Sequence, residues 1–241
     1  MHTTQSASLI LAIVVLSAVA PAQSRVVNRD HLWKQRCDSA GITYPPSGGI
    51  AFVAWKEQKL LEVWGRMRGE PYVLLHVYDV CRQSGTIGPK RMQGDAQVPE
   101  GMYMVTRFNP VSAFHLSLGI NYPNPGDRRQ ATGYPAGGDI YIHGNCVSAG
   151  CLAMTDRCIE EIYWIAHRVR RTTIPVLMFP TNDASRWSQL LGDSTAARHP
   201  SLHRFWTSLK PLHDAWLTER LVPAHAFDDE GLYLLQPRRR R

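Results

Sequence analysis

One histidine and three cysteines lie close together in the chain, at His143, Cys146, Cys151 and Cys158. A cysteine becomes a strong nucleophile as its thiolate, and a neighbouring imidazole stabilises that form. Gly144 and Gly150 flank the stretch between His143 and Cys151 and allow backbone conformations that other residues resist, so the thiol can return beside the ring. This pattern predicts nucleophilic acyl transfer, with backbone N–H groups near Cys151 holding the oxyanion.

Two other interpretations of the same cysteines compete with catalysis. His143, Cys146, Cys151 and Cys158 could bind zinc, but they include no Cys-x-x-Cys pair and their spacing is unusual, so we expect no metal. The cysteines could instead form structural disulfides, because the chain has five of them, including Cys37 and Cys81. Candidate pairs are Cys146 with Cys158 and Cys37 with Cys81, although the sequence does not choose the connectivity.

The N-terminal segment indicates export. Leu9 to Ala20 is an uncharged apolar run that is too short to cross a bilayer as a helix, and Ala20-Pro21-Ala22 follows as a small-x-small pattern. We expect residues 1–22 to be a signal peptide cleaved near Ala22, which places the protein in the periplasm. The alternative is an anchor in the inner membrane formed by residues 9–20.

Composition narrows the possible partners. The chain has 241 residues, of which 44% are hydrophobic and 20% charged, so it is neither a disordered chain nor a membrane bundle. Its net charge is +7, but four of the positive charges form the terminal run Arg238 to Arg241. The remainder is only mildly basic, which argues against a nucleic-acid partner and is compatible with an anionic polymer.

The chemistry-bearing stretch needs a scaffold of short strands. Hydrophobic patterns predict a hairpin over 50–64, a strand over 72–80 that is buried on both faces, strands over 102–108 and 114–118, and a strand over 140–142 that ends at His143. They predict helices over 30–37, over 156–171 with a cap at Thr155 or Asp156, and over 202–209 up to Pro211. A long loop over 121–139, a strand over 174–179 near a sheet edge, a linker over 182–200 and a hairpin over 224–235 complete the pattern.

These elements predict a mainly β chain with some α. We expect an N-terminal helical segment over 23–44, a catalytic domain over 45–181, and a C-terminal extension over 182–241 with a short helix, a hairpin and the basic tail.

The stretch IHGNCVSAGC, residues 142–151, resembles the active-site signature of the L,D-transpeptidase catalytic domain, or YkuD domain, and is most similar to its YafK-like branch. Runs over 61–64, 84–101 and 114–123 fit the same branch, so the likeness covers roughly residues 45 to 180. The resemblance implies a β-sandwich of mixed sheets with peripheral helices. It also implies acyl transfer on peptidoglycan stem peptides, without a cofactor and in a monomer.

By position, the resemblance makes Cys151 the nucleophile and His143 its base, with Gly150 and the Cys151 N–H at the oxyanion and Ser148 shaping the turn. Cys151 would attack the carbonyl of the third stem residue, a diamino acid, and release a terminal D-alanine. An amine would then complete transfer, whereas water would make the protein a hydrolase that trims stems or releases murein-linked lipoprotein. A non-catalytic envelope protein with structural cysteines is the third reading.

The sequence departs from the broader family beside the nucleophile. Ala149 stands where many relatives have His, Ala153 stands where an Arg is common, and the gap from His143 to Cys151 is short. The loss of that Arg leaves the substrate carboxylate without its usual contact. The substitutes that we consider are His115, Lys90, Arg91 and Arg107.

Overall fold

The computed structural model describes residues 25–132 and 135–238. The expected signal peptide or anchor and the end of the basic tail lie outside these residues. In the described part of the chain, eight strands form one sheet in the order β3-β2-β1-β8-β4-β5-β6-β7. The strands are β1 Ile50–Trp55, β2 Leu60–Gly65, β3 Val73–Asp79, β4 Gly101–Ser112, β5 His115–Ile120, β6 Tyr141–His143, β7 Leu152–Ala153 and β8 Pro175–Phe179.

The long strand β4 lets the sheet curl. Residues 101–104 of β4 pair with β8, whereas residues 105–112 pair with β5, so the two halves of the sheet share this strand. The β1–β8 and β6–β7 pairs are parallel and the others are antiparallel. The predicted fold class, with mixed sheets and peripheral helices, is confirmed.

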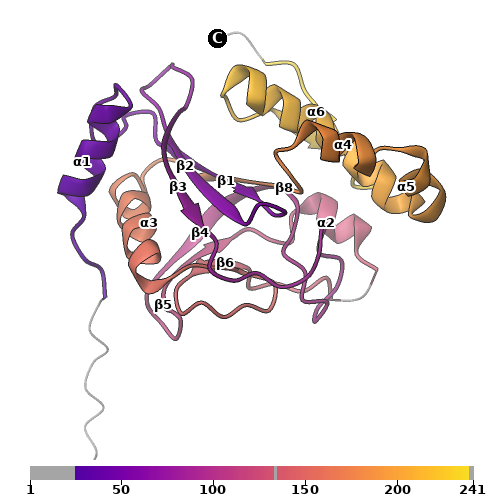
Figure 1. The fold of residues 1–241 in the computed structure, drawn as a ribbon, viewed down its shortest axis with the longest axis horizontal. Coiled ribbons are helices and arrows are strands. Elements are labelled where there is room, and N and C mark those ends of the chain that lie inside the picture. Colours follow the sequence, from indigo (N-terminus) through magenta and orange to yellow (C-terminus); the bar gives the residue numbers. More distant parts are fainter. Residues whose placement is uncertain (1–24, 133–134, 239–241) are drawn as a thin grey trace, which may run out of the picture.

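Two helices cover one face of the sheet, α1 (Asp30–Ser39) and α3 (Asp156–Arg168) (Figure 1). The predicted start of α3 is confirmed, because the Thr155 side chain accepts a hydrogen bond from the Cys158 N–H. The buried Trp33 of α1 donates its indole N–H to the Glu161 carbonyl at 2.8 Å. This contact fixes α1 against the helix that follows the cysteine-rich stretch.

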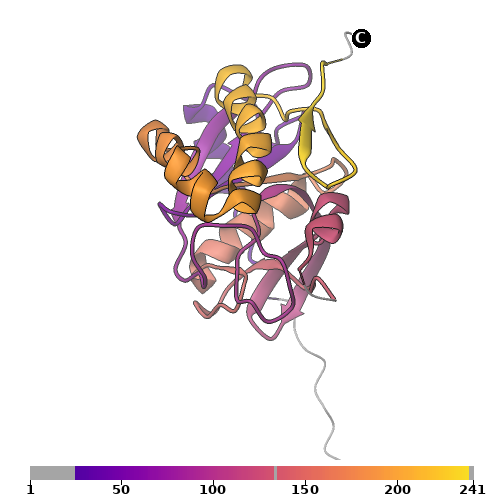
Figure 2. The same cartoon turned by 90° about the vertical axis from the view of Figure 1, so that its right-hand side faces the viewer.

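The C-terminal segment covers another part of the sheet with α4 (Ala184–Leu190), α5 (Asp193–Arg198), α6 (Pro200–Glu219) and the β9 (His225–Phe227)–β10 (Tyr233–Leu235) hairpin (Figures 1 and 2). The hairpin was predicted. The prediction of a linker over 182–200 was wrong, because this stretch contains α4, which the Asp183 side chain caps, and α5. The prediction that Pro211 ends the helix was also wrong. Pro211 lies inside α6, whose buried stripe of Phe205, Leu209, Leu212 and Trp216 outweighs the lost hydrogen bond.

Three further expectations fail for local reasons. The expected loop over 121–139 contains α2 (Pro125–Gln130), which begins at a capping box between Asn124 and Asp127. Strand β3 lies at a sheet edge, and within it Leu75 and Tyr78 are buried whereas Leu74, Val77 and Asp79 are exposed, so it is not buried on both faces. Strand β8 lies between β1 and β4 rather than near an edge, and Pro175 is tolerated because it is the strand's first residue. Within the described ranges, no helix is long and apolar enough to cross a membrane.

Candidate active site

Strand pairing brings His143 and Cys151 to one pair of neighbouring strands. Strands β6 and β7 run parallel, with Ile142 opposite Leu152 and His143 opposite Ala153. His143 is the last residue of β6, and Cys151 directly precedes β7, so both residues adjoin the same pair of strands. Because the strands are parallel, Cys151 lies at the level of Tyr141, near the start of β6, and His143 lies at its end.

The imidazole of His143 is held by the backbone directly after it. Its Nδ1 lies 2.7 Å from the Gly144 carbonyl oxygen, which can only accept, so Nδ1 carries the proton. Burial lowers the pKa of His143, and the hydrogen bond to Gly144 opposes this shift only in part. The resting ring is consequently neutral near pH 7, and its Nε2 is free of hydrogen and can accept a proton.

The thiol of Cys151 is protonated at rest. Burial raises the pKa of Cys151, while the Tyr141 backbone N–H and the positive charge of Lys90 lower it and Asp139 raises it. The Sγ atom lies 3.7 Å from the Asp139 carbonyl oxygen. Among the described residues, no hydrogen bond joins this thiol to His143. Such contacts are often long in free enzymes and tighten when substrate binds.

The loop between His143 and Cys151 has a demanding backbone. Gly150 has φ +108°, and Asn145 and Cys146 have φ +65° and +42°, a region that side-chain-bearing residues seldom adopt. A Cβ on Gly144 would lie 2.6 Å from Asp156 Oδ1, which itself accepts a hydrogen bond from the Asn145 N–H. Gly144 is thus required for close approach and Gly150 for its conformation, and such strain gathers at functional sites.

The two N–H groups that the resemblance assigns to the oxyanion donate hydrogen bonds to serine hydroxyls. The Gly150 N–H donates to Ser84 Oγ at 2.7 Å, and the Cys151 N–H donates to Ser148 Oγ at 3.2 Å. Ser148 Oγ also donates to the Cys151 carbonyl oxygen at 2.7 Å, which fits its predicted role in shaping the turn. A substrate oxyanion at this place must displace one or both hydroxyls.

The structure corrects the disulfide pairing. Cys81, which follows β3, is bonded to Cys146, while Cys37, Cys151 and Cys158 are free. Neither expected pair forms, because Cys37 is buried in the core and the loop between His143 and Cys151 lies beside the end of β3. Cys146 is therefore unable to act as a thiolate ligand, and the described residues contain no group of three or more His, Cys, Asp or Glu side chains that could hold a metal.

The four candidate carboxylate contacts fall in different places. Lys90 is buried, donates to Asp95 at 2.6 Å, and lies near enough to Cys151 to lower its pKa. His115 faces α3, with its Nε2 3.0 Å from Glu160 Oε1, and Arg107 is exposed and bonded to Tyr141. Arg91 lies between α2 and α6, where it contacts Gln130 and its guanidinium lies 4.7 Å from the Phe205 ring centre. Of these, Lys90 is the residue whose positive charge opposes the rise in the pKa of Cys151.

Sequence reasoning missed three residues that shape the site: Ser84, Gln97 and Asp139. The Gln97 carbonyl oxygen would lie 3.1 Å from a Cβ on Gly150, so it packs against the residue before Cys151. Ser84 and Gln97 both belong to the run over 84–101 that resembled the family, and this was the available signal.

Comparison with known proteins defines the class. Residues 49–178 match the L,D-transpeptidase catalytic domain, YkuD, and the chain belongs to this family. It is 38% identical over 173 residues to "Putative L,D-transpeptidase YafK" of Escherichia coli strain K12, across 70% of this chain and 67% of that protein. The YafK protein of Escherichia coli O157:H7 matches equally well.

Two solved structures share parts of the chain trace. The helical cell shape determining protein Pgp2 of Campylobacter jejuni, as a K307A mutant, aligns with a TM-score of 0.47 and 21% identity over 70% of this chain and 56% of Pgp2. Bd1075 of Bdellovibrio bacteriovorus aligns with a TM-score of 0.40 and 19% identity over 77% of this chain and 67% of Bd1075.

Proposed function

We propose that the protein is a cysteine acyltransferase of L,D-transpeptidase type that acts on peptidoglycan stem peptides through a thioester on Cys151. The observation that carries this proposal is a Cys151 thiol free of any disulfide that directly precedes β7, the strand paired with β6, whose last residue His143 has its Nδ1–H fixed by the Gly144 carbonyl. A nucleophile, a base and a group that orients the base are the parts that covalent acyl transfer needs.

The chemistry follows from the resting protonation states. His143 Nε2 removes the Cys151 proton as the sulfur attacks the amide carbonyl of the third stem residue. The tetrahedral oxyanion is held by the Gly150 and Cys151 N–H groups in place of the serine hydroxyls. As the C–N bond breaks, the imidazolium returns its proton to the leaving amine, which departs as D-alanine. The product is a thioester on Cys151 and a neutral His143.

Lys90 stabilises the Cys151 thiolate and does not bind the substrate carboxylate. Its ammonium is buried against Asp95 and the Met92 carbonyl, so it is not free to bind a peptide carboxylate. Its charge stabilises the Cys151 thiolate as it forms. His115 contacts Glu160 and so helps to hold α3 beside β5.

The second step is transfer to an amine of another stem. Hydrolysis of the same bonds, including release of murein-linked lipoprotein, is the second candidate, favoured by the alanine at position 153. Both reactions require the protein to work outside the cytoplasm, and we propose export to the periplasm through residues 1–22. The third reading, a non-catalytic envelope protein with structural cysteines, gains no support from the unpaired Cys151.

Incubation with purified muropeptides and mass spectrometry of the products tests the function. New dimers joined through two diamino-acid residues establish transfer, whereas shortened stems or lipoprotein-derived peptides without dimers establish hydrolysis. Cys151→Ala should abolish turnover, and His143→Ala should slow it by ~100-fold or more, the usual worth of a positioned base. Cys158→Ser, which removes another free thiol, is the matched control and should keep full rate. Full activity of Cys151→Ala would overturn the mechanism.

A further inference from the structure

An open cavity of about 420 Å³ lies between the loop that carries Arg91 and Gln97 and the C-terminal segment. Its walls come from the loop before β4, the end of α2, the first turns of α6 and the β9–β10 hairpin. The residues that give it chemical character are Arg91, Gln97, Gln130, Leu202, Arg204 and Glu230. The chemistry proposed above for Cys151 uses none of them.

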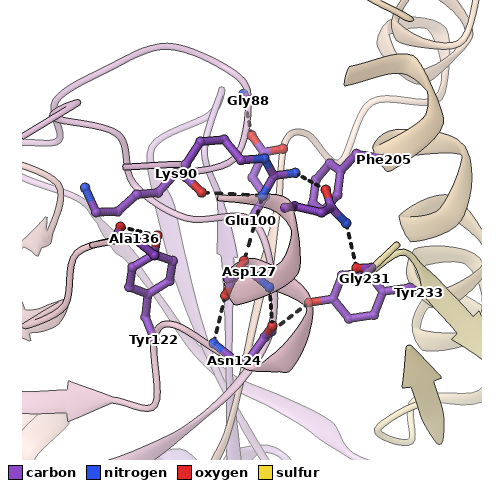
Figure 3. Close-up of polar contacts among 12 residues, drawn as sticks. Gly88, Lys90, Glu100, Tyr122, Asn124, Asp127, Ala136, Phe205, Gly231 and Tyr233 are labelled. Atoms are coloured by element: carbon purple, nitrogen blue, oxygen red, sulfur yellow. Dashed lines mark hydrogen bonds and ion pairs between the residues drawn. The ribbon is translucent and has the colours of Figure 1, made fainter. Parts of the chain in front are cut away.

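Arg91 is held in this wall by contacts from several elements. Gln130 accepts a hydrogen bond from its guanidinium and donates to the Gly231 carbonyl at 2.6 Å, so α2, Arg91 and the hairpin are connected. The Phe205 ring of α6 lies against the guanidinium, and Asp127 Oδ1 is 3.9 Å from it. Figure 3 shows Asp127, Asn124, Gly231 and Tyr233 gathered at this junction. A cation held in this way pays little ordering entropy when it binds an anion.

The other charges of the cavity are at its exposed side. Arg204 and Glu230 form an ion pair whose side chains are 54% and 63% exposed, so solvent can exchange with both. Exposed pairs are worth little in stability and are readily opened by a competing ligand. The cavity therefore offers two guanidinium groups and one carboxylate, with Leu202 as apolar wall. This combination suits a short peptide that carries both carboxylate and ammonium groups.

The cavity is connected to the nucleophile through Gln97. Its side chain accepts a hydrogen bond from the Thr86 N–H at 3.0 Å, and the residue lines the cavity. Its carbonyl oxygen packs against Gly150, the residue before Cys151. One segment of chain thus forms a wall of the cavity and a support of the catalytic loop.

We propose that this cavity binds the zwitterionic end of a peptidoglycan stem peptide, with Arg91 and Arg204 for carboxylates and Glu230 for the free amine of the diamino acid. The inference rests on the proposed function and extends it to a site built by the C-terminal segment. That segment then has a direct role in substrate binding.

Calorimetric titration of the full chain carrying Cys151→Ala, which cannot turn over, tests the binding site. The probe is a synthetic stem tripeptide that ends in a diamino acid, compared with forms whose side-chain amine is acetylated or whose carboxylates are amidated. Adding Ser201→Trp places an indole at the exposed Ser201 in the cavity wall and should weaken binding of the free tripeptide at least ~10-fold. Thr207→Trp, at another exposed position of α6 that does not line the cavity, should leave the affinity unchanged.

The modified peptides identify the charges. Glu230→Gln should weaken the affinity for the free tripeptide about 10-fold and leave the affinity for the acetylated peptide unchanged. Amidation of the peptide's carboxylates should weaken its binding to every protein that keeps Arg91 and Arg204. Equal affinity of the Ser201→Trp and Thr207→Trp proteins overturns the site, as does an acetylated peptide that binds as tightly as the free one.

Kinetics separate this inference from the proposed function. With Cys151 intact, Ser201→Trp should raise KM for muropeptides and leave the alkylation rate of Cys151 by iodoacetamide unchanged. If the Ser201→Trp protein turns over muropeptides with an unchanged KM, the proposed binding site is contradicted and the proposed function is not. If Ser201→Trp abolishes tripeptide binding while the wild-type protein does not turn over muropeptides, the binding site is supported and the proposed function is contradicted.

Discussion

The Cys81–Cys146 disulfide should be a major source of stability, and its removal is the sharpest test of the structure. It joins the end of β3 to the catalytic loop, with a sequence separation of 65 residues. Arg82 exchanges two backbone hydrogen bonds with Ala153, at 3.1 and 3.0 Å, so the chain beside the disulfide pairs with β7 two residues after Cys151. The crosslink and this bridge hold opposite ends of one loop.

The expected loss follows from the length of the closed loop. Closing 65 residues restricts the unfolded chain by an entropy worth about 4 kcal/mol at 25 °C. Because Cys81 is exposed and Cys146 half-buried, serine at both positions adds little desolvation cost, and the crosslink dominates the change. For a chain of this size each kcal/mol lowers Tm by roughly 2–4 °C, so Cys81→Ser with Cys146→Ser should melt roughly 8–16 °C below the wild type.

Calorimetry without reductant measures this shift, and Cys158→Ser serves as control because it removes a thiol without a crosslink. Thiol counting of the unfolded, unreduced wild type should find three thiols, namely Cys37, Cys151 and Cys158. The double variant should also lose turnover, since Asn145 and Cys146 hold positive φ in the loop that it releases. A Tm within about 2 °C of the wild type would refute the entropic reasoning, and a count of five or one would refute the pairing.

Further predictions concern the site and its support. Turnover should rise with pH as His143 deprotonates, with a midpoint below the usual 6.5 because burial lowers its pKa; a midpoint above 7 in a pH–rate profile contradicts this. Iodoacetamide alkylation of Cys151 should still accelerate above pH 9.0, because burial raises the pKa of the thiol, and a plateau by pH 8 would contradict it. Lys56→Met should lower the free energy of unfolding in urea by about 3–5 kcal/mol, since it leaves the carboxylate of Glu100 buried and unpaired, and adding Glu100→Gln should restore part of the loss. Gly144→Ala should cost about 1–3 kcal/mol in the same assay and reduce turnover, because its Cβ would collide with Asp156.

The sequence carried the local part of the site. Spacing and glycine placement singled out His143 and Cys151, which lies eight positions further on, and the resemblance of residues 142–151 to the family signature then favoured catalysis over a disulfide or zinc. The start of α3 was found because a cap and its first turn are adjacent in the chain. The start of α3 agrees with the structure because the cap and the first turn interact within a few residues of chain.

The contacts that complete the site join distant segments and leave no such pattern. Gly150 is 66 residues from Ser84, and Cys146 is 65 from Cys81. Which of five cysteines meet depends on where β3 and the catalytic loop come together, and this is a property of the curled sheet. The edge placement of β8 was wrong for a related reason. A proline is tolerated both at the first residue of a central strand and in an edge strand, and the sequence does not show which strands are neighbours.

The C-terminal segment is part of the machinery that supports the site, and buried charge shows why. Glu100 is fully buried, accepts the Gly88 N–H at 2.7 Å and the Trp206 indole N–H at 2.8 Å, and pairs with Lys56 at 3.0 Å. Lys56 in turn donates to the Gly88 and Val98 carbonyl oxygens, so it holds both ends of the loop that carries Arg91 and Gln97. A buried carboxylate must keep its donors, and one of them belongs to α6. Helix α6 therefore holds the loop whose far side packs against Gly150, and the segment beyond the matched family region is linked through that loop to the residue before Cys151.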